Sequence, residues 1–303
     1  MGAVDAFERV PELKVDPAPL SSTFRPEAPV PTWIAAPGGY RLAVRSYGAG
    51  GPRRPVIMLH GLQSHSGWFV QSARDLSQNG IPVYAFDRRG SGLTEAASDT
   101  EVRLEGLLAE IDAVADRAEA ETGHKDVTLV GHCFGAIPAL LYAALYRPGR
   151  VAGLVLATPA LYTLADLSLR DKARVLWSVL GGRPARVPVP LSPEQFSDLE
   201  PYVGFVRNDP LALHTAPARL MYEVALARRR LPRAARALRA PLLVAYAGGD
   251  VICDNQRNRR LLERVTSPMK TRTYPAARHI LEFSSERDAF FADLASWLVR
   301  GRA

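Results

Sequence analysis

A cysteine stands in a glycine-flanked turn that could present a nucleophile. Residues 127–130 form a short apolar run typical of a buried strand, and Gly-His-Cys-Phe-Gly follows it at 131–135. The apolar segment 136–146 then predicts a buried helix. Glycines leave room where strand and helix pass closely, and a helix N-terminus favours a thiolate over a thiol. We therefore interpret Cys133 as a nucleophile rather than as a small buried apolar residue.

A cysteine nucleophile needs a base, and the base needs an orienting carboxylate. Of the 6 histidines, His279 is the best candidate base, because it follows the last predicted strand, on the edge where active sites of α/β proteins form. Asp250 ends the preceding strand on that same edge, and the order cysteine, aspartate, histidine favours it as the acid. Asp254 is a rival that lies further into the same loop.

Two backbone N–H groups are expected to stabilise the oxyanion of an acyl-transfer reaction. One should come from Phe134, directly after the cysteine, and the other from Leu62, where Gly61 lets the backbone approach closely. No substrate-binding residue can be assigned from the sequence, but candidates lie near His60, Gly61 and His132. His60 is expected to shape its own loop, and the side chain of His132 should point away from the nucleophile.

The elements that must position these residues alternate between strands and helices. An opening hairpin is predicted from two β-prone segments on either side of Pro37-Gly38-Gly39. The later predicted strands are 56–59, 82–86, 127–130, 151–157, 241–247 and 270–274, and the predicted helices are 66–78, 100–122, 136–146, 256–265 and 285–300. Ser98 or Thr100 is a plausible cap for the second helix. This alternation predicts a doubly wound, mostly parallel sheet of the α/β class.

The alternation is interrupted once, which predicts an inserted cap. Residues 1–31 are proline-rich and aperiodic, so we expect an extended N-terminal arm. Residues 32–158 and 241–303 are expected to form the α/β core. Residues 159–240, with helical pieces, several prolines and mixed polarity, are expected to form a helical cap.

Composition excludes several other kinds of protein. The chain has 303 residues, 47% of them hydrophobic, so it can bury a large core without stabilising disulfide bonds or metal sites. Its 2 cysteines predict no disulfide framework, and we expect a cytoplasmic enzyme with no membrane span. The formal charge of +7 comes mainly from arginine and lacks any nucleic-acid-binding motif. No metal cluster or nucleotide loop is recognisable, so no metal or cofactor is expected.

With these residues in place, the chain resembles the α/β-hydrolase superfamily, in particular its monoacylglycerol lipase and lysophospholipase-like branch. The resemblance covers about residues 32–300 and depends on motifs at 60–66, 87–92, 131–135, 247–250 and 277–279. It implies an α/β-hydrolase fold and a triad of Cys133, His279 and Asp250. The chain departs from the family by having cysteine where serine is usual. Dienelactone hydrolases and polyhydroxyalkanoate synthases also carry a cysteine there, but neither is a close match in length or cap.

The leading functional hypothesis is acyl transfer through a thioester on Cys133, from an ester or thioester donor to an acceptor nucleophile or to water. A plain, lipase-like ester hydrolase is the alternative, and a silent scaffold that binds a ligand under its cap is a third reading. The arginines near the end of the cap could dock an acyl carrier protein or coenzyme A, although a solvated helix face explains them more simply: Arg219, Arg228, Arg229, Arg230, Arg233, Arg236 and Arg239.

Overall fold

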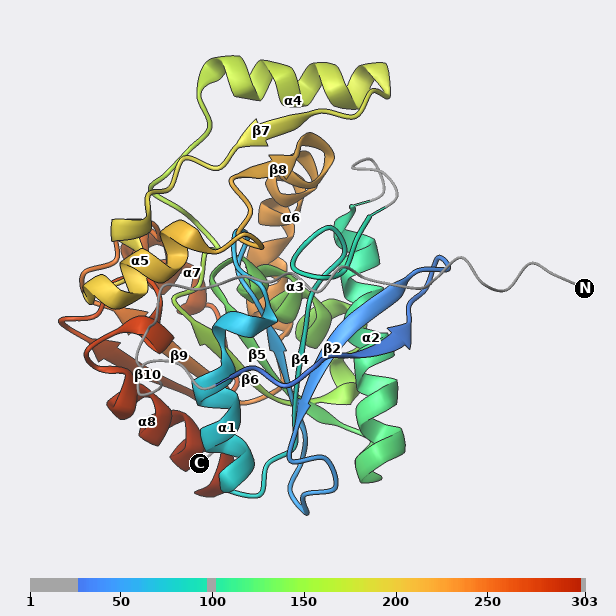
Figure 1. Cartoon of the computed structure of the whole chain (residues 1–303), viewed down its shortest axis with the longest axis vertical. Helices are drawn as coiled ribbons and strands as arrows, with labels where there is room; N and C mark the ends of the chain where they lie inside the picture. Colours follow the sequence, from blue (N-terminus) through green and yellow to red (C-terminus); the bar gives the residue numbers. More distant parts are fainter. Residues whose placement is uncertain (1–26, 97–101, 301–303) are drawn as a thin grey trace, which may run out of the picture.

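A computed structural model describes residues 27–96 and 102–300 of the chain (Figure 1). Most of the predicted N-terminal arm therefore lies outside the described residues, as do Ser98 and Thr100, the two predicted caps. Within the described part, no helix combines the length and the apolar character needed to cross a lipid bilayer.

A central eight-stranded sheet forms the framework, as the sequence predicts. The strands are β1 (Thr32–Ala35), β2 (Arg41–Tyr47), β3 (Val56–Leu59), β4 (Val83–Phe86), β5 (Val127–His132), β6 (Val151–Ala157), β9 (Leu242–Ala247) and β10 (Met269–Tyr274). Their spatial order is β1-β2-β4-β3-β5-β6-β9-β10, with β1 and β2 antiparallel to their neighbours and all later pairs parallel. The predicted opening hairpin is confirmed, and Gly38 and Gly39 supply the positive φ angles of its turn.

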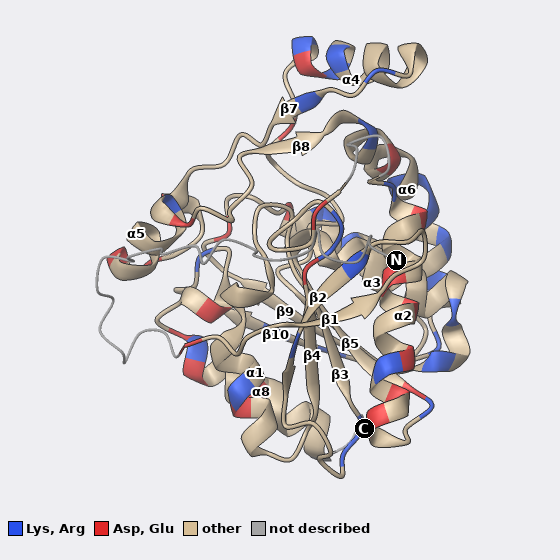
Figure 2. Ribbon diagram, turned by 45° about the vertical axis from the view of Figure 1, so that its right-hand side comes forward, with Lys and Arg blue, Asp and Glu red and all other residues tan. Residues whose placement is uncertain are grey.

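Helices cover both faces of this sheet (Figure 2). On one face, α1 (Val70–Gln78) packs against α8 (Arg287–Arg300). On the other face, successive contacts join α2 (Leu104–Thr122), α3 (Ala136–Leu141), α6 (Ala218–Ala237) and α7 (Asn255–Leu262). The central strands β3, β4, β5 and β9 are buried along their whole length, because parallel strands covered on both faces meet no water. The predicted α/β-hydrolase fold is thus confirmed.

The stretch between β6 and β9 contains more than helices. It comprises α4 (Leu169–Gly181), β7 (Arg186–Pro188), α5 (Glu200–Asn208), β8 (Thr215–Pro217) and α6. β7 and β8 pair as a two-stranded antiparallel sheet that the sequence did not predict. Above it, α4 packs on α6 at the top of the molecule in Figure 1. A small apolar cluster in this region has Val175, Val187 and Ala218 as its buried residues.

The motif after β4 fixes the loop beside the sheet. The Asp87 side chain is completely buried and accepts backbone N–H groups from Ser66 at 2.7 Å and Leu93 at 2.9 Å. Gly92 has a φ of +56°, and a Cβ there would lie 2.4 Å from the Asp87 carboxyl carbon. The carboxylate therefore holds the loops after β3 and β4 together, which explains an aspartate and a glycine at this spacing.

Candidate active site

The predicted nucleophile turn forms at the end of β5. Cys133 has a φ of +51°, a strained value for a residue with a side chain, and a short 3₁₀ turn leads from it into α3. A Cβ on Gly131 would lie 2.7 Å from the carbonyl oxygen of Gly135, and one on Gly135 would lie 2.4 Å from that of Leu59. Only glycine fits at these two positions, so the turn brings Cys133 to the carboxyl edge of the sheet.

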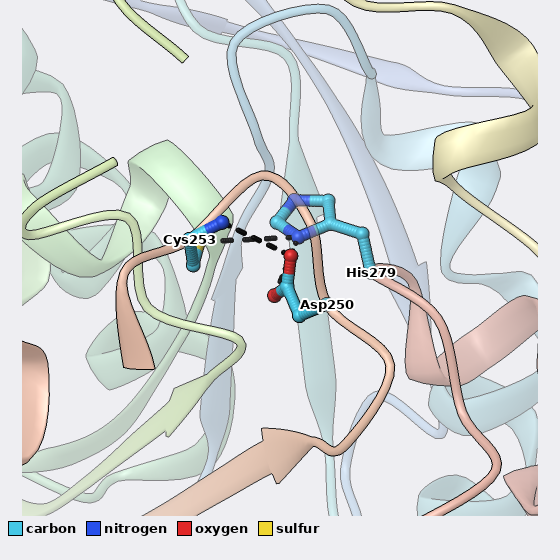
Figure 3. Close-up of side chains that lie close together, drawn as sticks. All are labelled: Asp250, Cys253 and His279. Atoms are coloured by element: carbon cyan, nitrogen blue, oxygen red, sulfur yellow. Dashed lines mark hydrogen bonds and ion pairs between the residues drawn. The ribbon is translucent and has the colours of Figure 1, made fainter. Parts of the chain in front are cut away.

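His279 and Asp250 meet at this edge (Figure 3). His279 Nδ1 lies 2.9 Å from Asp250 Oδ2, and neither side chain is exposed. The other oxygen of Asp250 accepts the N–H groups of Ile252 at 2.8 Å and Cys253 at 3.0 Å. Burial raises the pKa of Asp250, but the charge of His279 and these donors outweigh it and lower the pKa overall. Asp250 is thus a fixed carboxylate partner for the imidazole.

The rival carboxylate has a different task. Asp254 is the N-cap of α7 and accepts the N–H of Arg257 at 2.9 Å. This position next to a helix N-terminus accounts for its conformation without any role beside His279.

Cys133 and His279 each stabilise the charged form of the other, the thiolate of Cys133 and the imidazolium of His279. The Nε2 atom of His279 is buried and has no hydrogen-bond partner among the described residues. Burial lowers the pKa of His279, but the negative charges of Asp250 and Cys133 hold it well above its ordinary value. A hydrogen bond with Cys253 and the charge of His279 hold the pKa of Cys133 well below the ordinary thiol value, against the effect of burial. The arrangement favours a thiolate–imidazolium pair.

Cys253 is a neighbour that sequence reasoning missed. Its Sγ lies 3.3 Å from the carbonyl oxygen of Thr158 and 3.9 Å from His279 Nδ1. Burial raises the pKa of Cys253 well above its ordinary value, so it remains a thiol. Its single S–H can donate either to Thr158 or to the sulfur of Cys133. No spacing in the sequence signals this contact, because the sequence does not show which side chains of the loop after β9 face the edge of the sheet.

Three ligand-type atoms of Asp250, Cys253 and His279 lie within 4.8 Å of one another, a spacing that a metal ion could use. The hydrogen bonds described above already engage these atoms, and we assign no metal to them.

The two histidines named as neighbours of a substrate are packed inward. His60 Nε2 accepts the N–H of Arg88 at 3.1 Å, and its Nδ1 lies 2.8 Å from the carbonyl oxygen of Gly61. His132 stacks on Phe69 with ring centroids 4.0 Å apart. Burial lowers the pKa of each to about 3, so both rings are neutral. His60 shapes its loop as expected, and the side chain of His132 occupies the core.

Gly61 lies directly against Cys133. A Cβ at this position would come within 3.2 Å of the Cys133 Cβ and 3.6 Å of its sulfur. The N–H of Gly61 donates to Ser64 Oγ at 2.8 Å, which fixes the loop after β3 close to Cys133. A larger residue here would push the nucleophile and the loop apart.

Arg88 links the two residues expected to supply oxyanion N–H groups. Its Nη2 donates to the carbonyl oxygen of Leu62 at 2.6 Å, and its guanidinium lies 5.4 Å from the centroid of the Phe134 ring. Leu62 and Phe134 line the same cavity as Cys133. Their N–H groups remain the proposed oxyanion donors, with Arg88 as the brace between the two loops.

A mostly apolar cavity of about 310 Å³ extends from Cys133. Its walls come from the nucleophile turn, the loop after β6, the segment around β7 and one side of α6. His60, Gly61 and His132 are not among the lining residues. Such a cavity has the size and character of a binding site for a small apolar molecule.

The fold and the buried pair at the end of the sheet define an enzyme of the α/β-hydrolase type. A family model described as serine aminopeptidase, S33, matches residues 50–286. The chain belongs to this family of hydrolases.

Proteins similar to this chain include two curated lipases and a solved structure. Human monoglyceride lipase is 28% identical over 290 residues, which cover 92% of this chain and 93% of the lipase. Monoacylglycerol lipase of Mycolicibacterium smegmatis is 27% identical over 252 residues, which cover 82% of this chain and 89% of that protein. The crystal structure of Paleococcus ferrophilus monoacylglycerol lipase has a TM-score of 0.77 and 23% identity, covering 86% and 98% of the two chains. This last likeness concerns the fold.

Proposed function

We propose that this enzyme cleaves carboxylic esters or thioesters through an acyl-thioester on Cys133 and passes the acyl group to an acceptor nucleophile or to water. The observation that carries the proposal is the position of Cys133 in the strained turn, beside a buried His279–Asp250 pair that favours its thiolate. The names of the similar lipases support an ester of a fatty acid as the donor. They lend no support to an acyl carrier protein or coenzyme A as partner.

In the first half-reaction, the thiolate of Cys133 attacks the carbonyl carbon of the donor. The carbonyl electron pair moves onto oxygen, where the N–H groups of Leu62 and Phe134 are proposed to stabilise it. The intermediate collapses, the bond to the leaving group breaks, and the imidazolium of His279 protonates the departing alcohol or thiol. Asp250 keeps the imidazole in the orientation and tautomer that this transfer needs.

In the second half-reaction, the now neutral His279 accepts a proton from water, an alcohol or an amine as that nucleophile attacks the thioester. Collapse of the second intermediate releases the acylated product and restores the thiolate of Cys133 beside the imidazolium. A thioester has a higher acyl-transfer potential than an ester and reacts well with amines. Cysteine therefore suits transfer to an acceptor as well as hydrolysis.

The proposal is tested with p-nitrophenyl octanoate and an octanoyl thioester, by intact-protein mass spectrometry and product analysis. Wild type should carry an octanoyl adduct on Cys133, and Cys133→Ala should carry none. His279→Ala should acylate slowly and retain whatever adduct forms. Absence of any Cys133 adduct from a donor that wild type consumes would reject the covalent mechanism.

A plain lipase-like hydrolase is the second candidate, favoured by the lipases that resemble this chain. Hydrolysis and acyl transfer are distinguished by adding alcohol or amine acceptors to reactions of wild type and of Cys133→Ser. If wild type gives mainly octanoate in every reaction and the serine variant matches it, hydrolysis is the function. If wild type turns over only with an acceptor and the serine variant stalls, acyl transfer is the function.

A further inference from the structure

Arg228 differs from the other arginines of α6 in its surroundings. Figure 2 shows basic residues along α6, and most of the arginines in its second half are exposed: Arg229, Arg230, Arg233 and Arg236. Arg219, near the start of α6, forms an ion pair with Glu223 at 2.8 Å. Arg228 is half-buried and lines the apolar cavity that also contains Cys133. It therefore needs an explanation other than a solvated helix face.

Within the part of the chain that the structure describes, Arg228 has no carboxylate partner. Its Nη2 donates to the hydroxyl of Thr163 at 3.1 Å, and its Nε is buried without any hydrogen-bond partner. Asp166 also lines the cavity, but it forms an ion pair with Lys172, where both side chains are well exposed. Burial is the main cause that lowers the pKa of Arg228, and the charge of Asp166 offsets it only in part. A cation in apolar surroundings with an unsatisfied N–H donor raises the free energy of the folded protein, unless a ligand accepts that hydrogen bond.

The arginine lies near the reacting groups. Thr163, its hydrogen-bond partner, forms an isolated β-bridge with Cys253, and Leu164 N–H donates to the carbonyl oxygen of Ile252 at 2.8 Å. These contacts join the loop after β6 to the loop that carries Asp250. The neighbouring side chains of α6 in the cavity, Met221, Val224 and Ala225, are apolar. The other charged residues of the wall, Asp166 and Lys172, pair with each other where both are well exposed. Arg228 thus stands beside apolar side chains of its own helix, within reach of a molecule bound at Cys133.

We infer that Arg228 binds a carboxylate of the substrate and makes this enzyme prefer acyl esters or thioesters that carry one. The inference deepens the proposed function and rests on it. A guanidinium offers parallel N–H donors that match the two oxygens of a carboxylate, and here the unused Nε is one of them. The carboxylate can belong to the acyl chain, at the end remote from the reacting carbonyl, or to the alcohol portion of the ester. Both sources use the same recognition chemistry.

Matched substrates test the inference and locate the carboxylate. For the acyl side, p-nitrophenyl hydrogen suberate is compared with p-nitrophenyl octanoate, which has the same leaving group and chain length. For the alcohol side, the octanoyl ester of 3-hydroxypropanoate is compared with propyl octanoate. Wild type should prefer the charged member of one pair, and that pair identifies the source.

Variants at position 228 must then remove that preference. Arg228→Met keeps the apolar bulk and should lower kcat/KM for the charged substrate by about 10–100-fold, mainly through KM, because a hydrogen bond to a charged group is lost. The neutral substrate should lose little. Arg228→Lys keeps the positive charge but lacks the paired N–H donors of a guanidinium. Its kcat/KM for the charged substrate should lie between those of wild type and Arg228→Met. Arg229→Met, on the exposed side of the same helix, is the matched control and should behave as wild type.

Three results would overturn the inference: no preference for either charged substrate in wild type, equal losses on charged and neutral substrates in Arg228→Met, or the same effect in Arg229→Met. The neutral esters report the proposed function separately, since turnover of octanoate esters without any carboxylate preference leaves that function intact. If no ester is turned over, calorimetry decides. Suberic acid monoamide is compared with octanamide for the acyl side, and N-octanoyl-β-alanine with N-propyloctanamide for the alcohol side. The charged member of one pair should bind at least about tenfold more tightly than its neutral match, and Arg228→Met should abolish the difference. Equal binding within both pairs overturns the inference.

Discussion

At the scale of the residue, the unusual feature is a pair of thiols with opposite tendencies. Cys133 favours the thiolate, and the neighbouring Cys253 remains protonated and can donate a hydrogen bond to it. The main lowering effect on the pKa of Cys133 comes from Cys253, ahead of the charge of His279. The reactivity of the candidate nucleophile thus depends on a residue outside the expected triad.

Replacing Cys253 should alter the pH at which Cys133 reacts. Because the pKa of Cys133 is depressed in the folded protein, its thiolate persists as the pH falls and is lost only when that low pKa is crossed. Cys253→Ala should raise this pKa, so iodoacetamide alkylation of Cys133 weakens at a higher pH than in wild type. Cys253→Ser retains a donor and should stay close to wild type. Peptide mass spectrometry follows the rate of Cys133 alkylation as a function of pH. Identical pH midpoints of this rate in all three proteins would contradict the prediction.

Mutations should distinguish the role of Asp250, the partner of His279, from that of its rival Asp254. Asp250→Asn should reduce kcat by about 10²–10⁴, because an amide cannot stabilise the imidazolium or its tautomer. Asp254→Ala should leave kcat nearly unchanged and lower the free energy of unfolding by about 1 kcal/mol through loss of the α7 cap. Kinetics and urea denaturation measure the two effects. A larger loss of kcat in Asp254→Ala than in Asp250→Asn would exchange their assignments.

At the scale of the element, the β5–α3 junction is limited by backbone contacts. The glycine spacing around Cys133 was informative because strand and helix can pass this closely only without a Cβ. The sequence predicted the central strands β3, β4, β5, β6 and β9 well, since each is a short, mainly apolar run that ends at a turn signal. It missed β7 and β8 because three-residue strands that end in proline, Pro188 and Pro217, carry no periodicity.

Gly135→Ala should prevent the junction from forming. Its Cβ would lie 2.4 Å from the Leu59 carbonyl oxygen, so backbone must move, and we expect a loss of more than about 4 kcal/mol in the free energy of unfolding or no folded protein. Gly106→Ala on α2 meets nothing within 4 Å and is the matched control. It should stabilise the protein by about 0.5–1 kcal/mol. Equal denaturation midpoints for the two variants would refute the steric argument.

The limits of sequence reasoning also appear at this scale. The expected triad could be selected because each of its members follows a predicted strand of the same sheet. Arg228 could not be distinguished from the other arginines of α6, since only the packing of that helix reveals which side lines the cavity. Cys253 follows Asp250 in the same loop, yet it was not connected with Cys133, because the sequence does not show which side chains of that loop face the edge of the sheet. The rings of His60 and His132 are buried in the framework, whereas their neighbours Leu62 and Cys133 line the cavity, so substrate binding by residues near them stays a prediction.

At the scale of the whole molecule, the residues that the structure describes contain two buried apolar clusters of very different size. The main cluster spans the sheet and the helices on both faces, whereas the buried members of the second are Val175, Val187 and Ala218. Local stability follows the amount of buried apolar surface. The region of α4 and β7 is therefore expected to open more easily than the sheet that carries the proposed triad.

Hydrogen exchange followed by mass spectrometry should show this difference. Peptides from α4 and β7 should exchange well before those from β5, β6 and β9, whose residues are almost all buried. A ligand that occupies the cavity should slow exchange in α4 and β7 selectively, because Val175 and Pro188 are part of its wall. Exchange of both regions at one common rate would contradict the prediction.

The neighbouring positions of β6 and β9 have a consequence for how this enzyme could diversify. These strands are hydrogen-bonded to each other, yet the chain between them passes through α4, β7, α5, β8 and α6. The stretch before α6 thus leaves and re-enters the framework without separating any strand pair. Insertions, deletions or an exchanged counterpart from a relative can be accommodated around α4 and β7, whose buried apolar cluster is separate from the main core. The segment before α5 is more constrained, because the carbonyl oxygen of Phe196 accepts the N–H of Ile280, next to His279, at 2.9 Å. New substrate ranges can therefore arise in the part of the gene that encodes α4 and β7 while the reacting groups remain where they are.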